Sequence, residues 1–246
     1  MKKLIYNIAI LLLMAVYTTS CGLDNYDAPQ SKLYGQILYK DASGTEHPLQ
    51  VKGTGEAVKL SLYQYGYQLT DGITVFVDQD AKFEALLFDG EYHMIPNRSN
   101  GPWKSIQISE AKKDTIDFTL KGTTEVKVYV TPYFMIENAA VDLNGTNVSV
   151  SWDTKQIIPD AKVNTQSVFI SSTRFVDEST NIIREDFGDD KTAGSKSFSF
   201  TVKDAGQLKN LENAKLHTGK VYARVGVKAE GADQFIYSEI IEIAVK

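Results

Sequence analysis

The sequence predicts an all-β protein in which two tandem antiparallel β-sandwiches follow a cleaved signal peptide and a short tether. Three observations support this fold class. Apolar and polar residues alternate with a period of two along most of the chain, which is typical of half-buried strands. Turn-forming pairs such as Asp89-Gly90 and Asn144-Gly145 separate the alternating stretches. The only cysteine of the 246 residues, Cys21, stands just after an apolar N-terminal stretch.

Residues 1–20 have the organisation of a signal peptide. Lys2 and Lys3 form a positively charged start, and an apolar stretch from Leu4 to Val16 follows. This stretch is shorter than the about 20 residues that a transmembrane helix needs. We therefore expect residues 1–20 to be removed from the mature protein.

Small residues precede the cysteine at the end of this segment. Thr18-Thr19-Ser20 followed by Cys21 resembles a bacterial lipobox, and the resemblance implies cleavage before Cys21 and lipidation of that residue. The alternative is an ordinary secreted protein with an accidental cysteine. Residues 21–30 would form a lipidated tether, in which Asp24 and Asp27 resemble the surface-export signal of Bacteroidetes. We expect a protein anchored by lipid in the outer membrane and facing the cell surface, with a periplasm-facing anchor as the alternative.

The mature chain divides into two groups of predicted strands. The clearest alternations of the first group are Leu33 to Tyr39, Val58 to Tyr63, Ile73 to Val77, Phe83 to Leu87, Glu91 to Ile95 and Thr115 to Leu120. Those of the second group are Glu125 to Val130, Asn147 to Trp152, Gln166 to Ser171, Ser197 to Val202, Lys220 to Lys228 and Phe235 to Val245. A turn signal at Lys121-Gly122-Thr123-Thr124 separates the groups, so we predict domains at residues 31–122 and 123–246. Gln207 to Leu216 has the composition of a helix.

Composition and charge exclude several classes of protein. The net charge of −5, which becomes −7 when the two lysines of the signal peptide are lost, argues against a nucleic-acid partner. One cysteine and three histidines are too few for a disulfide framework or a Cys/His zinc site. The sequence contains no Gly-x-Ser-x-Gly, no His-Glu-x-x-His and no phosphate-binding loop. We therefore expect no enzyme activity, no catalytic residues, no cofactor and no metal site.

The two groups of strands resemble known sandwich domains. Leu33-Tyr34-Gly35-Gln36-Ile37 and the hairpin Phe88-Asp89-Gly90-Glu91-Tyr92 are similar to a carboxypeptidase regulatory-like, or transthyretin-like, domain. Val148-Ser149-Val150-Ser151-Trp152 and Val221-Tyr222-Ala223-Arg224-Val225 resemble strands of a fibronectin type III or immunoglobulin-like domain. The first resemblance implies a sandwich without catalytic residues of its own.

Further motifs connect nearly the whole chain to one family. The lipobox, the stretch from Leu62 to Tyr67, Gly101-Pro102-Trp103 and the stretch from Val130 to Phe134 resemble a Bacteroidetes family of two-domain lipoproteins of unknown function. Such proteins are often encoded beside starch-utilisation-type outer-membrane transporter pairs. The resemblance implies a role in the cell envelope near glycan uptake, with a transporter complex as a partner, and it brings no assigned catalytic residues.

Three tyrosines are the first candidate binding residues. Tyr63, Tyr65 and Tyr67 alternate along one stretch, and on a continuing strand they lie on the face opposite Leu60 and Leu62. Exposed tyrosine rings stack on the C–H faces of sugars or anchor a protein interface. The alternative is that these rings cover a sheet edge or the joint between the domains.

Trp103 and Thr115 complete the candidate residues. Trp103 follows Gly101-Pro102 in a turn-rich loop, where it is either a sugar contact or a plug over the core. Asp114-Thr115-Ile116 resembles the O-glycosylation motif of Bacteroidetes with Thr115 as acceptor, and a chance match is the alternative. The sequence thus predicts a non-catalytic surface lipoprotein of a glycan-uptake system that binds oligosaccharide or polysaccharide through these aromatic residues. A scaffold that contacts a transporter or a partner lipoprotein without binding glycan is the alternative.

Overall fold

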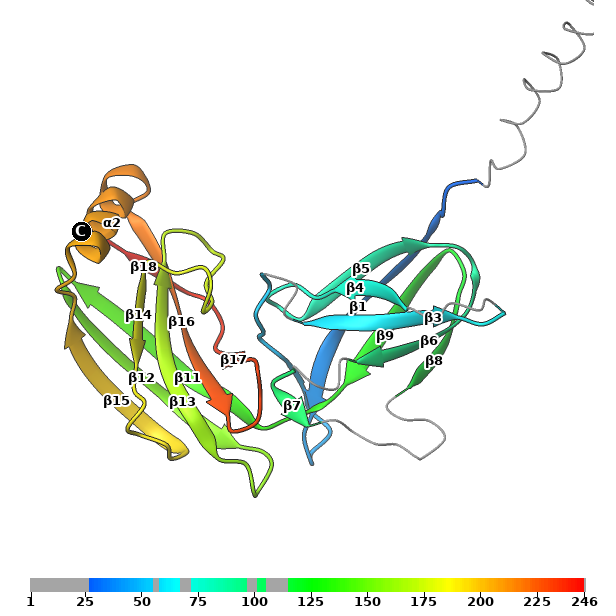
Figure 1. Ribbon diagram of the computed structural model, residues 1–246, viewed down its shortest axis with the longest axis horizontal. Helices are drawn as coiled ribbons and strands as arrows, with labels where there is room; N and C mark the ends of the chain where they lie inside the picture. The colour runs from blue at the N-terminus through cyan, green and yellow to red at the C-terminus, as the bar shows by residue number, and fades with distance from the viewer. Residues whose placement is uncertain (1–26, 55–57, 67–71, 97–100, 105–114, 246) are drawn as a thin grey trace, which may run out of the picture.

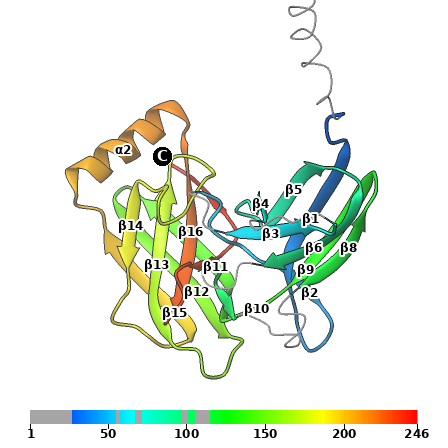
Figure 2. The same cartoon turned by 45° about the vertical axis from the view of Figure 1, so that its right-hand side comes forward.

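The computed structural model shows two β-sandwiches placed side by side along the longest axis of the molecule (Figures 1 and 2). The predicted all-β fold class is confirmed. The structure describes residues 27–54, 58–66, 72–96, 101–104 and 115–245. Within these ranges, no helix is both long enough and apolar enough to cross a membrane. The predicted signal peptide, Cys21 and Tyr67 lie outside the described residues.

The first sandwich packs two sheets face to face. One sheet contains β1 (Ser31–Lys40), β2 (Glu46–Pro48), β5 (Lys82–Leu87) and β9 (Thr123–Tyr129). The other has the order β4 (Ile73–Phe76), β3 (Lys59–Gln64), β6 (Gly90–Pro96) and β8 (Ile116–Leu120). Because side chains alternate between the two faces of a strand, Leu33 and Ile37 of β1 and Leu60 and Leu62 of β3 all enter one core, where they are fully buried.

The predicted division at residues 122 and 123 is wrong by one strand. Gly122 has a positive φ of 62°, which glycine accepts, and the turn there leads from β8 in the second sheet to β9 in the first. β9 pairs with β1 from Lys32↔Thr123 to Leu38↔Tyr129, and this pair is parallel rather than antiparallel as predicted. The domains therefore meet at β10 (Thr131–Pro132), which pairs with β7 (Trp103–Lys104).

The second sandwich also packs two sheets against each other. One sheet contains β11 (Phe134–Asn144), β12 (Asn147–Gln156) and β15 (Gly194–Thr201). The other contains β13 (Val163–Ser171), β14 (Ile183–Asp186), β16 (Lys220–Ala229), β17 (Ile236–Tyr237) and β18 (Ile241–Ala244). Trp152 is only 2% exposed between them, as its alternating strand predicts. The predicted helical segment is α2 (Ala205–His217), whose first turn is capped by the Asp204 carboxylate.

A shared hydrophobic core joins the two sandwiches. Val51 and Trp103 of the first sandwich belong to the same buried cluster as Val227 and Ile236 of the second. Val227 lies on β16 and Ile236 on β17, and Figure 1 shows β17 on the side of the second sandwich that is nearest the first. Because apolar contacts run across the junction without interruption, packing holds the two sandwiches in one orientation.

Polar contacts reinforce this junction. Arg224 of β16 is fully buried and donates hydrogen bonds to the backbone oxygens of Val51 and Gln79 in the first sandwich, at 3.1 and 3.4 Å. The hydroxyl of Thr54 donates to the buried carboxylate of Asp177 at 2.6 Å. These bonds link segments far apart in the sequence, so the junction is specified by directional contacts as well as by apolar packing.

Candidate functional site at the domain junction

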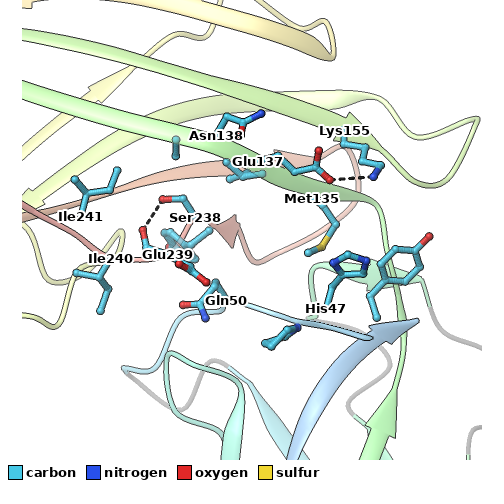
Figure 3. Close-up of a pocket in the computed structure, with 15 residues that line it drawn as sticks. His47, Gln50, Met135, Glu137, Asn138, Lys155, Ser238, Glu239, Ile240 and Ile241 are labelled. Carbon is cyan, nitrogen blue, oxygen red and sulfur yellow. Dashed lines mark hydrogen bonds and ion pairs between the residues drawn. The ribbon is translucent and has the colours of Figure 1, made fainter. Parts of the chain in front are cut away.

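A cavity of about 420 Å³ lies between the two sandwiches. Figure 3 shows His47 and Gln50 on the side of the first sandwich, and Glu137 and Lys155 on the side of the second. Small-molecule sites in proteins have about this volume and are often found where domains meet. The cavity is therefore the candidate functional site, and each of its walls has a distinct chemistry.

One wall is an aromatic pair at the far end of β1. Tyr39 lies directly opposite His47 in the antiparallel pairing of β1 with β2, and the two rings stack with centroids 6.0 Å apart. His47 Nε2 lies 2.8 Å from a carboxylate oxygen of Asp41, which also accepts hydrogen bonds from the backbone of Ser43 and Thr45. Because an ionised carboxylate only accepts, the imidazole donates and its ring is held in place.

The same contacts lower the pKa of Asp41. Hydrogen bonds from the Ser43 hydroxyl and from His47 stabilise the ionised carboxylate, and they hold its pKa well below the ordinary value. In the unfolded chain this carboxyl has the ordinary pKa of about 3.9. Its contribution to stability is therefore complete above that value and is lost as the pH falls toward the lower pKa of the folded state.

We expect the variant Asp41→Asn to have a lower Tm than the wild type at pH 7. The difference should shrink as the pH falls below about 4, because the Asp41 carboxyl then takes up a proton in the unfolded chain while it is still ionised in the folded protein, and this favours unfolding of the wild type. Thermal unfolding between pH 2 and pH 8 measures this. The exposed Asp160 offers a matched control, and Asp160→Asn should have nearly the same Tm as the wild type at pH 7. A Tm difference for Asp41→Asn that does not depend on pH would contradict the assignment.

The opposite wall comes from an irregular part of β11. The register between β11 and β12 shifts between Glu137 and Ala140, and Asn138 within this bulge has a positive φ of 53°. The Asn138 side chain donates to Asp153 at 2.7 Å, which holds the bulge. Glu137 accepts from Lys155 at 2.9 Å beside it. The bulge therefore brings an ion pair and a backbone kink to the rim of the cavity.

The third side is formed by the chain after β17. Ser238 and Glu239 line it, and Gln50 of the first sandwich lies beside them, where its backbone oxygen accepts a hydrogen bond from the backbone nitrogen of Tyr237 at 2.9 Å (Figure 3). The side-chain oxygen of Gln50 accepts a hydrogen bond from Arg224 at 3.1 Å, so its side-chain nitrogen is left to donate to a ligand. The cavity thus combines two stacked rings with both donors and acceptors of hydrogen bonds. Such a site can hold a small, polar, hydroxyl-bearing molecule.

Trp103 is not an exposed contact, which corrects its role as a candidate sugar-binding residue. Its side chain is 3% exposed and belongs to the core shared by the two sandwiches. Gly101 lies so close to the indole that an added Cβ would stand 2.4 Å from a ring carbon. Trp103 pairs with Pro132 through the short β7–β10 ladder. The residue is the plug over the core that the sequence left as the alternative.

Tyr63 and Tyr65 lie together on the outer face of the first sandwich. Tyr63 stacks on His93 with centroids 4.9 Å apart, and Tyr65 approaches the same imidazole at 5.0 Å. The Tyr65 hydroxyl donates to Asp117 at 3.1 Å, and 54% of the residue remains exposed. Both rings are therefore on the face opposite Leu60, whereas Tyr65 follows the end of β3 rather than continuing it. Their binding of sugar stays a prediction.

Thr115 is half-buried and directly precedes β8. Asp114, the first residue of the proposed glycosylation motif, lies outside the described residues. O-glycosylation of Thr115 stays a prediction.

The residues that line the cavity were missed by the sequence analysis. Tyr39 and His47 belong to one hairpin, and its Asp41-to-Thr45 turn is a signal that could have paired them. No local signal connects this hairpin with Glu137 and Lys155, which are brought near it only by the packing of one domain on the other.

The comparisons with known proteins match the fold over both domains. The family described as "Protein of unknown function (DUF3823) N-terminal domain" matches residues 31–131, and "Domain of unknown function (DUF3823_C)" matches residues 134–242. This division agrees with the boundary at β10. No curated protein matches the chain.

Solved structures of similar proteins include some from Parabacteroides and Bacteroides species. A DUF3823 family protein from Parabacteroides merdae is 42% identical, with a TM-score of 0.74 over 88% of this chain and 100% of that one. A DUF3823 family protein from Bacteroides ovatus is 23% identical, with a TM-score of 0.71 and the same coverage. A "putative carbohydrate binding protein" from Bacteroides uniformis is 17% identical, with a TM-score of 0.67 and the same coverage. The last two show a shared fold, and the resemblance to a two-domain Bacteroidetes family is confirmed by the whole set. The chain belongs to the DUF3823 family, in which the N-terminal and C-terminal domains are both of unknown function.

Proposed function

We propose that this protein is a non-catalytic glycan-binding lipoprotein of the outer membrane, and that it serves a glycan-uptake system. The cavity at the domain junction carries the proposal. It presents the stacked rings of Tyr39 and His47 beside polar side chains from both sandwiches. The description of the Bacteroides uniformis relative as carbohydrate-binding supports the ligand class. The lipobox-like segment before Cys21 supports the anchor.

The chemistry of the cavity suits a sugar. A pyranose ring has apolar C–H faces that stack on flat rings, and hydroxyls on its edge that both donate and accept hydrogen bonds. The Tyr39–His47 pair offers the flat surface, while Gln50 and Glu239 offer a donor and an acceptor. Lys155 and Glu137, which form an ion pair at 2.9 Å, supply a further donor and a further acceptor.

Replacing Tyr39 with alanine is expected to weaken glycan binding about tenfold, because it removes the stacking surface. Affinity electrophoresis or calorimetry with a panel of polysaccharides measures the change. Tyr34→Ala is the matched control, since Tyr34 lies on the same strand with its side chain on the outer face of the sheet and 38% of it exposed. This control should bind as the wild type does.

Two results would contradict the proposed site. Equal loss of affinity in both variants would show that binding depends on the fold rather than on the cavity. If the wild-type protein binds no glycan of the panel, glycan is not its ligand. That result would favour a scaffold role beside a transporter or a partner lipoprotein.

A further inference from the structure

Three segments meet at the end of the first sandwich from which the tether leaves. β1 begins there with Ser31, whose hydroxyl donates to Asp89 in the β5–β6 turn. The backbone nitrogen of Gly122, in the β8–β9 turn, donates to the Ser31 hydroxyl at 2.9 Å. We call the surface formed by these turns and the end of β3 the tether end. Figure 1 shows it at the side of the first sandwich that faces away from the second.

Large apolar side chains are exposed at the tether end. Phe88 in the β5–β6 turn is 48% exposed, and Leu86 on the outer face of β5 is 63% exposed. Tyr65, which follows β3, is 54% exposed. Its backbone nitrogen donates a hydrogen bond to the backbone oxygen of Glu91 at 2.9 Å, which holds the residue at this end. Single exposed residues of this size are common, but here Phe88 lies in the turn at the end of the sandwich, and Leu86 and Tyr65 flank it on the outer faces of the two sheets. Phenylalanine and leucine insert into the boundary of a bilayer, and tyrosine is enriched there.

The length of the tether places this end next to a membrane. Residues 22–30 separate Cys21 from Ser31, and nine residues span at most about 30 Å when fully extended. A lipid on Cys21 would therefore confine the tether end to a thin layer above the bilayer. At such a short tether length, the effective concentration of surface and protein is about millimolar, so a weak contact is enough to be populated.

The charges of the tether end are mixed, and acidic side chains outnumber basic ones. Lys32 and Lys121 offset Glu84 and Asp89, and Lys32 is paired with Glu84 at 2.8 Å. Asp89 is occupied by hydrogen bonds from Ser31 and from the backbone of Gly122. Glu91 and Asp117 beside Tyr65 add two further carboxylates, so the contact depends on the apolar side chains and the short tether rather than on attraction to an anionic headgroup surface.

We infer that the tether end is a membrane-docking surface, on which Phe88, Leu86 and Tyr65 enter the headgroup layer while Cys21 holds the chain to the same bilayer. This inference rests on the lipid anchor of the proposed function and adds a defined orientation to it. The first sandwich stands on its tether end, and the cavity at the far end of β1 is held away from the membrane. Tyr65 then belongs to a lipid contact rather than to a sugar contact.

The docking surface can be tested with tryptophan reporters. The mature chain, residues 21–246, is coupled through its only cysteine to a maleimide-bearing lipid in vesicles of phosphatidylethanolamine and phosphatidylglycerol with brominated acyl chains. Bromine quenches tryptophan only at short range. The reporter is Phe88→Trp, and the matched control is Phe76→Trp, which is 49% exposed. Phe76 pairs with Lys59 at the other end of β3, about 17 Å from the tether end.

The two reporters should give opposite results. On brominated vesicles, the Phe88→Trp variant should lose most of the fluorescence that its new tryptophan adds. The Phe76→Trp variant should keep the fluorescence that its new tryptophan adds. Trp103 and Trp152 are buried and contribute equally to both variants. Quenching of Phe88→Trp that does not exceed quenching of Phe76→Trp would overturn the inference. Because the coupling supplies the anchor chemically, and glycan binding is measured separately, docking and the proposed function can fail independently.

Discussion

Replacing Arg224 with methionine is expected to lower the free energy of unfolding by about 3 kcal/mol and to loosen the two sandwiches from each other. Arg224 is fully buried at the junction, where its guanidinium donates to the backbone oxygens of Ser238 at 2.9 Å and Val51 at 3.1 Å. It also donates to the side chain of Gln50 at 3.1 Å. Methionine keeps much of the volume but leaves these acceptors without a donor in a dry site.

Among the described residues, no carboxylate forms an ion pair with the guanidinium of Arg224. Burial lowers the pKa of Arg224 to about 10, which is the cost of placing a cation in a dry junction. Carbonyl oxygens from both sandwiches compensate for this cost, and the ring of Tyr237 lies 4.6 Å from the guanidinium carbon. Val51, Gln50 and Gln79 belong to the first sandwich, so the hydrogen bonds of Arg224 to them form only when the domains are correctly placed. The residue thus makes the two sandwiches unfold together.

Urea denaturation followed by both far-UV circular dichroism and tryptophan fluorescence measures the effect. The wild type should show one transition by both probes. Arg224→Met should show either a single transition at a lower urea concentration or different transitions by the two probes. Arg174→Met is the matched control, because Arg174 is exposed in the same domain, and its stability should change by less than about 0.5 kcal/mol. A variant Arg224→Met that is as stable as this control would contradict the role of Arg224.

Replacing Trp103 with alanine is expected to cost about 3 to 5 kcal/mol of stability, since it removes a large buried side chain and leaves a cavity. The indole is 3% exposed and shares a core with Val51 and Phe134, one from each sandwich. Gly101 packs against its face, so the backbone before it is shaped to the ring. Trp103→Phe should retain most of the stability because an aromatic ring still fills the site.

The same experiment separates a core role from a ligand role. If Trp103 is a core residue, the fraction of Trp103→Phe that remains folded should bind glycan as the wild type does. Tyr65→Ala serves as the control for an exposed aromatic residue, and its stability should change by less than about 1 kcal/mol. Unchanged stability of Trp103→Ala together with lost glycan binding would restore the assignment of Trp103 as a sugar contact.

The two tryptophans show what the sequence could and could not predict. Trp152 lies on a strand whose alternation continues for several residues, so its inward direction follows from the period of two. Trp103 follows Gly101-Pro102, where no period exists to assign a direction. Its burial results from packing in the core shared by the two sandwiches, beside the partner strand β10, and these are tertiary contacts. Local patterns therefore predicted the strands and the sandwiches, and they did not predict what covers a loop.

The boundary error has a similar physical origin. The alternation of β9 is the same whether the strand belongs to the first or the second sandwich. Its place is decided by pairing with β1, some ninety residues earlier in the chain (Lys32↔Thr123), and that register is not visible in a local window. The cavity was out of reach for a further reason. His47 and Lys155 come together only through the orientation of the domains, which depends on buried contacts such as those of Arg224.

β1 also decides how the protein would respond to a pulling force. The strand begins at Ser31, where the tether arrives, and it ends at Lys40, beside the Tyr39–His47 wall of the cavity. Along its length it is bonded to β5 on one side and to β9 on the other. Tension between an anchored N-terminus and a ligand held in the cavity would act along β1, across hydrogen bonds that lie at a steep angle to the strand. Both ladders would then have to shear at once instead of opening bond by bond, so the first sandwich would resist unfolding under force.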